Sequence, residues 1–254
     1  MYEPMIEPKS IQRDLVKQGL LNDFHEKRKD YLETIRATYP EVSPKGVLFE
    51  KFDVKDAVVW IDPLDGTSDF VKGNLSAVTV LIGLSINGIS RLGVVHNPFT
   101  DEDPSKGRTL FGTIEHGLLA LEYDEKMTGE VYRTRKISYL EPFDHLEVPK
   151  EDHTFVVAAS LSHFNQQMKE IIEKISPVDI RRLGGAGNKC SNLALGRVDT
   201  YMHPSYGLKY WDLCAPEILI KAMGGYATNV KEQKLTYFPQ ENRQLSGLIV
   251  GRNP

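Results

Sequence analysis

The alternation of apolar and polar residues predicts a run of β-strands near the middle of the chain. Residues 78–86 and 89–96 are two apolar-rich segments, and Asn87-Gly88 between them is a pair that favours a two-residue hairpin turn. Residues 109–122 continue the same up-and-down pattern. An antiparallel meander is therefore expected in this part of the chain.

The second half of the chain alternates differently, with short strands and helices following one another. This alternation is typical of a layered α/β arrangement. A charged stretch at residues 124–152 predicts a boundary or an exposed insertion. We therefore expect residues 1–150 to form an α+β half and residues 151–254 to form an α/β half. The expected strands span residues 154–160, 179–183 and 199–202, and the expected helices span residues 164–175, 188–195 and 212–223.

A six-residue segment, DPLDGT at 62–67, follows the apolar run 57–61 and carries two carboxylates three residues apart. Hard divalent cations need clustered oxygen ligands, which Asp62 and Asp65 can supply. Gly66 and Thr67 offer backbone N–H groups at the start of a short helix, where a phosphate oxygen can bind. The segment also fits a simpler interpretation, a polar turn with an Asp helix cap.

A third carboxylate, Asp212, opens the predicted helix 212–223, which Gly224-Gly225 closes. It can be a helix cap, or it can be a further metal ligand that the fold brings in from far along the chain.

A glycine-rich segment, GGAGNK at 184–189, leaves the backbone bare, so that a ligand can approach closely. Lys189 adds a positive charge for a phosphate. The alternative is a tight connection between a strand and a helix, with a solvated lysine.

Composition limits the classes of function. The 254 residues are 41% apolar and 26% charged, as in ordinary globular proteins. The net charge of −4 shows no basic excess and argues against binding of nucleic acid polymers, so an anionic substrate needs local positive charge or a metal. The sequence contains no GxSxG elbow, no His-rich ligand cluster and no Walker-type loop. Catalytic arrangements other than a carboxylate metal site therefore have little support.

The two cysteines, Cys190 and Cys214, are expected to be buried thiols rather than a disulfide, which suits a reducing compartment. No apolar run reaches membrane-spanning length, and no signal peptide opens the chain. We therefore expect a cytoplasmic protein without a membrane partner.

Two motifs resemble those of the magnesium-dependent, lithium-sensitive inositol monophosphatase superfamily. Its WxDPxDGT and WDxxAP patterns correspond to WIDPLDGT at 60–67 and WDLCAP at 211–216. Within the superfamily, the segments SLSH at 160–163, GGAGNK at 184–189 and GRTLFG at 107–112 resemble the 3′(2′),5′-bisphosphate nucleotidase branch. The similarity extends from about residue 54 to residue 251.

The resemblance implies a layered α/β sandwich with a site between its halves. It implies that Mg2+ is the cofactor, with Asp62, Asp65, Asp212 and the backbone carbonyl of Leu64 as its ligands. Thr67 and Asp65 take the catalytic roles, with Thr67 beside the attacking water. The residues that the resemblance places against the substrate are Gly66, Thr67, Ser160, His163, Gly185 and Lys189. Arg181 and Arg182 are weaker candidates, and one of them is expected to pair with a surface carboxylate.

The implied activity is a phosphatase that removes the 3′-phosphate of adenosine 3′,5′-bisphosphate, or of its sulfated relative, by metal-activated water. Two alternatives stay open: an inositol phosphate phosphatase, and a catalytically impaired relative that binds the nucleotide. The family's Gly-Glu-Glu segment does not occur before Asp62, and Glu7, Glu41 and Glu50 are possible substitutes. The family's closing helix is missing after Val250, so the sandwich is expected to be shortened at both ends.

Overall fold

The computed structural model describes residues 52–252 except for residues 101–102, 104, 125–134, 141–142, 144–153, 163, 175–177, 240–244 and 246. All the described residues belong to one compact unit, Phe52–Pro254. Glu7, Glu41, Glu50 and His163 lie outside the described residues. The boundary expected between residues 150 and 151 also lies outside them and stays a prediction.

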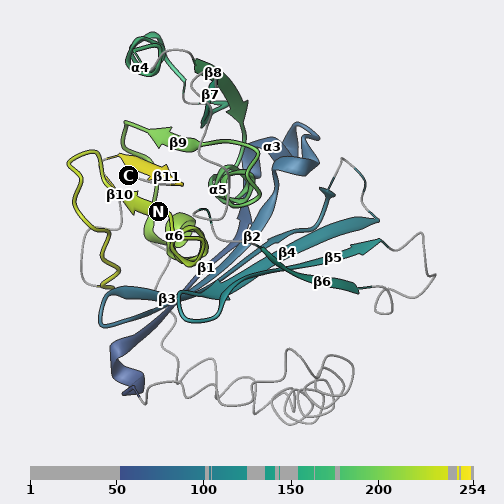
Figure 1. Cartoon of the computed structure of the whole chain (residues 1–254), viewed down its shortest axis with the longest axis vertical. Coiled ribbons are helices and arrows are strands. Elements are labelled where there is room, and N and C mark those ends of the chain that lie inside the picture. Colours follow the sequence, from purple (N-terminus) through teal and green to yellow (C-terminus); the bar gives the residue numbers. More distant parts are fainter. Residues whose placement is uncertain are drawn as a thin grey trace. The chain divides into compact units, whose positions relative to one another are not determined.

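A six-stranded antiparallel sheet forms the first layer, with the strands in sequence order (Figure 1). The expected hairpin is confirmed, because Asn87 and Gly88 both have positive φ, 51° and 74°, as a type I′ turn requires. The strands are β1 (Ala57–Asp65), β2 (Thr79–Ile86), β3 (Ile89–Asn97), β4 (Lys106–Thr113), β5 (Gly117–Asp124) and β6 (Arg135–Leu140). Two short 3₁₀ helices, η1 (Val54–Asp56) and η2 (Leu75–Ala77), precede β1 and β2.

Strand β6 corrects one expectation. The charged stretch 124–152 was expected to be a boundary or an exposed insertion, but Arg135–Leu140 pairs with β5 along its length. β6 is the last strand of its sheet, and charged residues are common on such edges because they discourage pairing with another chain. Arg135 and Lys136 therefore hid the strand from a search for apolar alternation.

A five-stranded mixed sheet forms a second layer, in the order β10-β11-β9-β7-β8. Strand β7 (Phe155–Ser160) runs parallel to both β8 (Val178–Leu183) and β9 (Thr200–His203). Strands β10 (Tyr226–Thr228) and β11 (Leu248–Gly251) complete the sheet in antiparallel pairing. The three strands that the sequence predicts in this half are confirmed.

The described residues form four α-helices: α3 (Thr67–Val71), α4 (Gln166–Ile172), α5 (Ala186–Ala194) and α6 (Tyr210–Ala222). The helices expected in the second half are confirmed, although α4 is shorter than predicted. It begins after Asn165, whose side chain accepts the backbone N–H of Met168 at 2.8 Å as a helix cap. No helix among the described residues has the length and apolar character that a membrane crossing needs.

Helices α5 and α6 lie between the two sheets and contain much of the core (Figure 1). Helix α6 contacts β1 to β5 on one side and β10 and β11 on the other. Leu213, Ile218 and Leu219 of α6 are almost wholly buried. Cys190 and Cys214 are buried and free, which confirms the prediction of two thiols.

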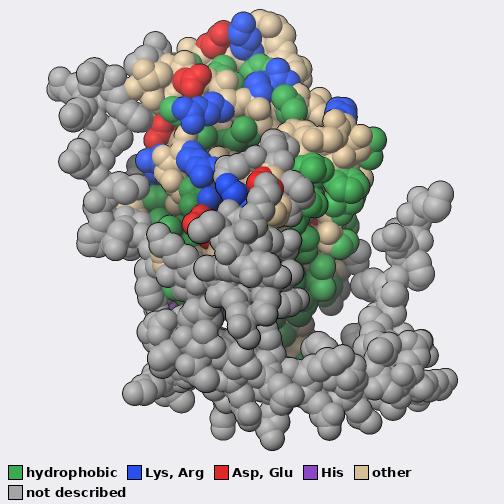
Figure 2. Space-filling model, turned by 90° about the vertical axis from the view of Figure 1, so that its right-hand side faces the viewer, with side chains coloured by type: hydrophobic (Ala, Val, Ile, Leu, Met, Phe, Trp, Pro, Cys, Tyr) green, Lys and Arg blue, Asp and Glu red, His purple; other side chains and the backbone are tan. Residues whose placement is uncertain are grey.

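The surface is mixed in charge. On the face shown in Figure 2, Lys and Arg side chains gather in the upper half, with acidic side chains between them. Local positive charge therefore exists on a chain whose net charge is −4.

Candidate metal centre and adjoining pocket

Strand β1 continues beyond residue 61, where the sequence suggested a turn. The strand continues to Asp65, which pairs with Thr79 of β2, and the register shifts between Asp62 and Asp65. Pro63 in this interval has no N–H for the ladder, and the N–H of Leu64 donates to Asp62 Oδ1 at 3.0 Å instead. An irregularity inside a strand therefore separates the two carboxylates.

The short helix expected after this segment is confirmed. Gly66 has φ 83°, a left-handed conformation that suits glycine, and α3 begins at Thr67. The Thr67 hydroxyl donates to the backbone carbonyl of Leu64 at 2.9 Å. Two residues of the predicted site are thereby joined directly.

Asp212 lies in the first turn of α6, and its carboxylate accepts the backbone N–H of Lys209 at 2.7 Å. Asp212 therefore takes part in capping α6 as the third helical residue of a capping box, while the N-cap itself is Lys209. This capping does not exclude a second role, because one carboxylate has about four acceptor positions.

An aromatic contact holds β1 against the start of α6. The rings of Trp60 and Tyr210 meet edge to face, with centroids 5.5 Å apart, and Trp60 Nε1 donates to Ser85 Oγ at 2.9 Å. Both rings are buried. Trp60 lies two residues before Asp62, and Tyr210 lies two residues before Asp212, so this contact brings the two carboxylates near each other.

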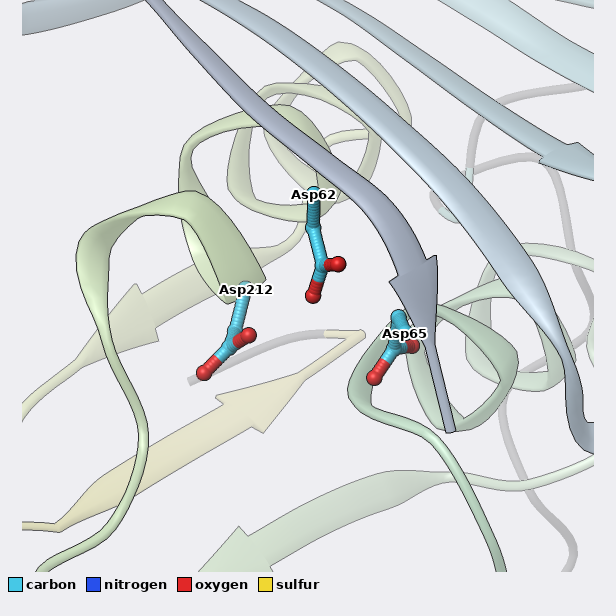
Figure 3. A group of neighbouring side chains, drawn as sticks. All are labelled: Asp62, Asp65 and Asp212. Carbon is cyan, nitrogen blue, oxygen red and sulfur yellow. The ribbon is translucent and has the colours of Figure 1, made fainter. Parts of the chain in front are cut away.

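Asp62, Asp65 and Asp212 meet at one place (Figure 3). One ligand oxygen from each lies within 4.8 Å of the others. Figure 3 shows the first two side chains coming from β1 and the third from α6. The convergence that the sequence predicts, across about 150 residues of chain, is confirmed.

The electrostatics of this cluster fit a bound cation. Burial, together with the neighbouring charges of Asp65 and Asp62, raises the pKa of Asp212 to about 7. Burial also raises the pKa of Asp65. Three close carboxylates form an oxygen-only donor set, which a hard divalent cation prefers and whose mutual repulsion it would relieve.

Asp65 has a further role that sequence patterns did not indicate. Its carboxylate accepts the Thr79 hydroxyl at 2.7 Å and the backbone N–H groups of Gly187 and Ala186 at 2.8 and 3.1 Å. These N–H groups belong to the first turn of α5, where the helix dipole favours negative charge. Asp65 therefore joins β1, β2 and α5, besides taking part in the carboxylate cluster.

A pocket of about 220 Å³ adjoins the cluster and is lined by Asp65 and Asp212. Its lining includes most of the residues predicted to contact substrate: Gly66, Thr67, Ser160, Gly185 and Lys189. His163, the remaining predicted contact, lies outside the described residues. Gly184 and Ala186 of the glycine-rich segment and Ser162 of the SLSH segment also line it. The lining further includes residues that the sequence interpretation did not single out: Ser68, Asp69, Tyr201, His203, Tyr206, Gly207 and Leu208.

Lys189 is buried, which contradicts the alternative of a solvated lysine. Its side chain is 4% exposed, and Nζ lies 3.4 Å from the Leu183 carbonyl and 5.1 Å from the centroid of the Tyr201 ring. Burial lowers the pKa of Lys189. The Tyr201 hydroxyl is also buried and has no hydrogen-bond partner among the described residues. The pocket is thus lined by a buried lysine and by the buried Tyr201.

The glycines at 184 and 185 are required by close packing. A Cβ on Gly185, which has φ 62°, would lie 2.4 Å from the Ala77 carbonyl oxygen. A Cβ on Gly184 would lie 2.3 Å from the carboxylate of Asp69. The signal that could have found Asp69 is its place in the first turn of the short helix that follows Asp65 and Gly66.

Comparison with known proteins decides the family. Residues 29–247 match the model of the inositol monophosphatase family. The chain belongs to this family. Human 3'(2'),5'-bisphosphate nucleotidase 1 is 34% identical over 187 residues, 72% of this chain and 53% of that protein. Inositol monophosphatase 3 of Xenopus laevis is 28% identical over 199 residues, 75% of this chain and 47% of that protein. The chain spans about half the length of the curated relatives it matches.

Solved structures of the inositol monophosphatase family confirm the layered fold. CysQ of Bacteroides thetaiotaomicron aligns with a TM-score of 0.58 at 23% identity, over 86% of this chain and 80% of that chain. Inositol monophosphatase II of Staphylococcus aureus aligns with a TM-score of 0.56 at 20% identity, over 96% and 82%. The predicted α/β sandwich and the predicted superfamily are both correct.

Proposed function

We propose that this member of the inositol monophosphatase family is a Mg2+-dependent phosphatase that removes the 3′-phosphate of adenosine 3′,5′-bisphosphate or its sulfated relative. The observation that carries the proposal is the cluster of Asp62, Asp65 and Asp212 beside a pocket that contains the buried Lys189. A metal-ligating group next to a fixed cation suits a substrate with two phosphates, one of which reacts while the other is held.

In this proposal Asp62, Asp65, Asp212 and the Leu64 carbonyl hold the metal. Bound Mg2+ supplies charge neutralisation at the phosphate and lowers the pKa of water. Thr67 holds the attacking water: its hydroxyl donates a hydrogen bond to the Leu64 carbonyl, so its oxygen can accept a hydrogen bond from that water. The backbone at Gly66 and Thr67 binds the reacting phosphate at the start of α3.

The choice of nucleotide rests on the pocket and on the relatives. Lys189, which lines the pocket, suits a ligand with a second anionic group. Relatives named 3'(2'),5'-bisphosphate nucleotidase 1 share 27–34% identity with this chain, against 26–30% for those named inositol monophosphatase 3. The free thiols of Cys190 and Cys214 suit a cytoplasmic protein.

The test is phosphate release from three substrates by the purified protein: adenosine 3′,5′-bisphosphate, its sulfated analogue and inositol 1-phosphate. We expect release from the first two with Mg2+ and none with EDTA. Lithium chloride should slow the reaction more than sodium chloride at equal ionic strength, because Li+ is a small hard ion with half the charge of Mg2+. Absence of release from all three substrates would contradict the proposed activity.

Lys189→Met sharpens the substrate assignment, because Met keeps most of the buried volume and removes the charge. The Michaelis constant for adenosine 3′,5′-bisphosphate should rise by about tenfold or more, with a smaller effect on kcat. Inositol 1-phosphate has no second phosphate and should be unaffected. An equal loss for both substrates, or a preference of the parent protein for inositol 1-phosphate, would favour the inositol phosphate phosphatase.

The remaining alternative is a relative that binds the nucleotide without turnover. Glu7, Glu41 and Glu50, the possible substitutes for the family's Gly-Glu-Glu segment, lie outside the described residues, so this alternative stays a prediction. Calorimetric binding of adenosine 3′,5′-bisphosphate without phosphate release would support it.

A further inference from the structure

Arg182 of β8 holds the segment that connects β7 to α4. Its Nε donates to the Ser160 carbonyl at 3.1 Å, and its Nη2 donates to the Leu161 carbonyl. The same guanidinium lies over the Phe164 ring, 4.5 Å from its centroid. One side chain therefore contacts residues near the beginning and near the end of the connection between β7 and α4. Figure 1 shows where β7, β8 and α4 lie.

The connection reaches the pocket beside the carboxylate cluster. Ser160 and Ser162 both line that pocket, and Leu161 lies between them. The Leu161 N–H donates to the Leu183 carbonyl at 3.0 Å, while its own carbonyl accepts from Arg182. Because a guanidinium is planar and its donors have fixed directions, two bonds to successive carbonyls fix the peptide planes on both sides of Leu161. The direction in which Ser160 and Ser162 face the pocket follows from those planes.

Arg181 offers a comparison within the same strand. It is exposed, as Arg182 is, and it also donates to a backbone carbonyl. Its partners are the Asp179 carboxylate at 3.3 Å and the Arg197 carbonyl at 2.8 Å, which are not part of the β7–α4 connection. Successive residues of a strand point to opposite faces, so the two arginines have the same charge and different tasks.

We propose that Arg182 is a positioning residue, which orients Ser160 and Ser162 so that they bind the part of the substrate that does not react. The inference rests on the proposed function. Contacts to a non-reacting part stabilise the ground and transition states alike. Loss of Arg182 therefore raises the Michaelis constant and leaves kcat nearly unchanged.

The test compares Arg182→Lys with Arg181→Lys, because lysine keeps the charge but cannot donate to two carbonyls in a fixed plane. Arg182→Lys should raise the Michaelis constant for adenosine 3′,5′-bisphosphate by about five- to tenfold, with kcat within about twofold of the parent. Arg181→Lys should match the parent in both constants. Equal Michaelis constants in the two variants, or a fall in kcat alone, would overturn the inference.

A second readout does not depend on turnover. Hydrogen exchange of the metal-free protein should show faster exchange of the Leu161 amide in Arg182→Lys than in Arg181→Lys, with residues 57–67 unchanged in both. Equal exchange in the two variants overturns the inference. If the parent protein hydrolyses none of the substrates, the proposed function fails, and the exchange comparison alone decides whether Arg182 orders the connection.

Discussion

The carboxylate cluster and the β7–α4 connection lie on the same pocket, but they are held in place by different means. Asp65 is 8% exposed and accepts hydrogen bonds from two elements besides its own strand. Leu161, by contrast, is 41% exposed and is held by one exposed arginine and one backbone bond. The mutually repelling carboxylates are held by buried hydrogen-bond donors, whereas the segment beside the substrate pocket is held by an exposed side chain. Substitutions that lower kcat should therefore be separable from substitutions that change the Michaelis constant.

The largest effect is expected at the cluster, where Asp62→Asn and Asp65→Asn form a matched pair. Each should lower kcat/KM by about a thousandfold, because each removes a charge that holds the metal. Asp65→Asn should also lower the free energy of unfolding by about 2–3 kcal/mol. The reason is that both Asp65 oxygens accept hydrogen bonds, so an amide places a donor against donors.

Asp62→Asn keeps the oxygen that accepts the Leu64 N–H, and it relieves repulsion within the cluster. Its unfolding free energy in EDTA should therefore equal or exceed that of the parent. Urea unfolding and phosphate release, measured on the same preparations, check both variants. Equal stability of the two variants would show that the hydrogen bonds of Asp65 do not stabilise the packing of β1, β2 and α5. Undiminished turnover in either variant would show that the cluster has no catalytic role.

A smaller effect is expected at the glycine segment. Gly185→Ala should lower the free energy of unfolding by about 3 kcal/mol, because it adds both a positive-φ alanine and a contact of 2.4 Å with the Ala77 carbonyl. Gly224→Ala is the control: Gly224 also has positive φ, 84°, but a Cβ there would have no heavy atom within 4 Å. It should lose only about 1–2 kcal/mol. Urea unfolding measures both. Equal losses of unfolding free energy would mean that the residues around Gly185 rearrange to accept a methyl group.

The smallest effect is expected at the far end of the β7–α4 connection. Asn165→Ala removes the cap of α4 and should lower the free energy of unfolding by about 1 kcal/mol. The kcat should not change, since Asn165 does not line the pocket. Thermal unfolding and steady-state kinetics check this prediction. A fall in kcat as large as that of Asp62→Asn would mean that the surface connection and the cluster are not separable.

Local sequence patterns determined much of this molecule. Asn87-Gly88 specifies its hairpin because both residues tolerate positive φ, and the apolar runs beside it specify β2 and β3 because side chains alternate between the faces of a strand. The residue types at 62–67 and at 212 indicated an oxygen-rich cluster, since hard divalent cations prefer carboxylate ligands.

Tertiary structure decided what depends on partners distant in the chain. The hydrogen bonds to Asp65 come from Thr79 and from the first turn of α5, and neither belongs to the DPLDGT segment. The sequence alone left a solvated Lys189 possible, whereas in the fold its Nζ contacts the Leu183 carbonyl and the Tyr201 ring. Backbone preference and side-chain periodicity are set by nearest neighbours in sequence, whereas burial, pKa shifts and hydrogen bonds between elements exist only after the sheets have packed on α5 and α6.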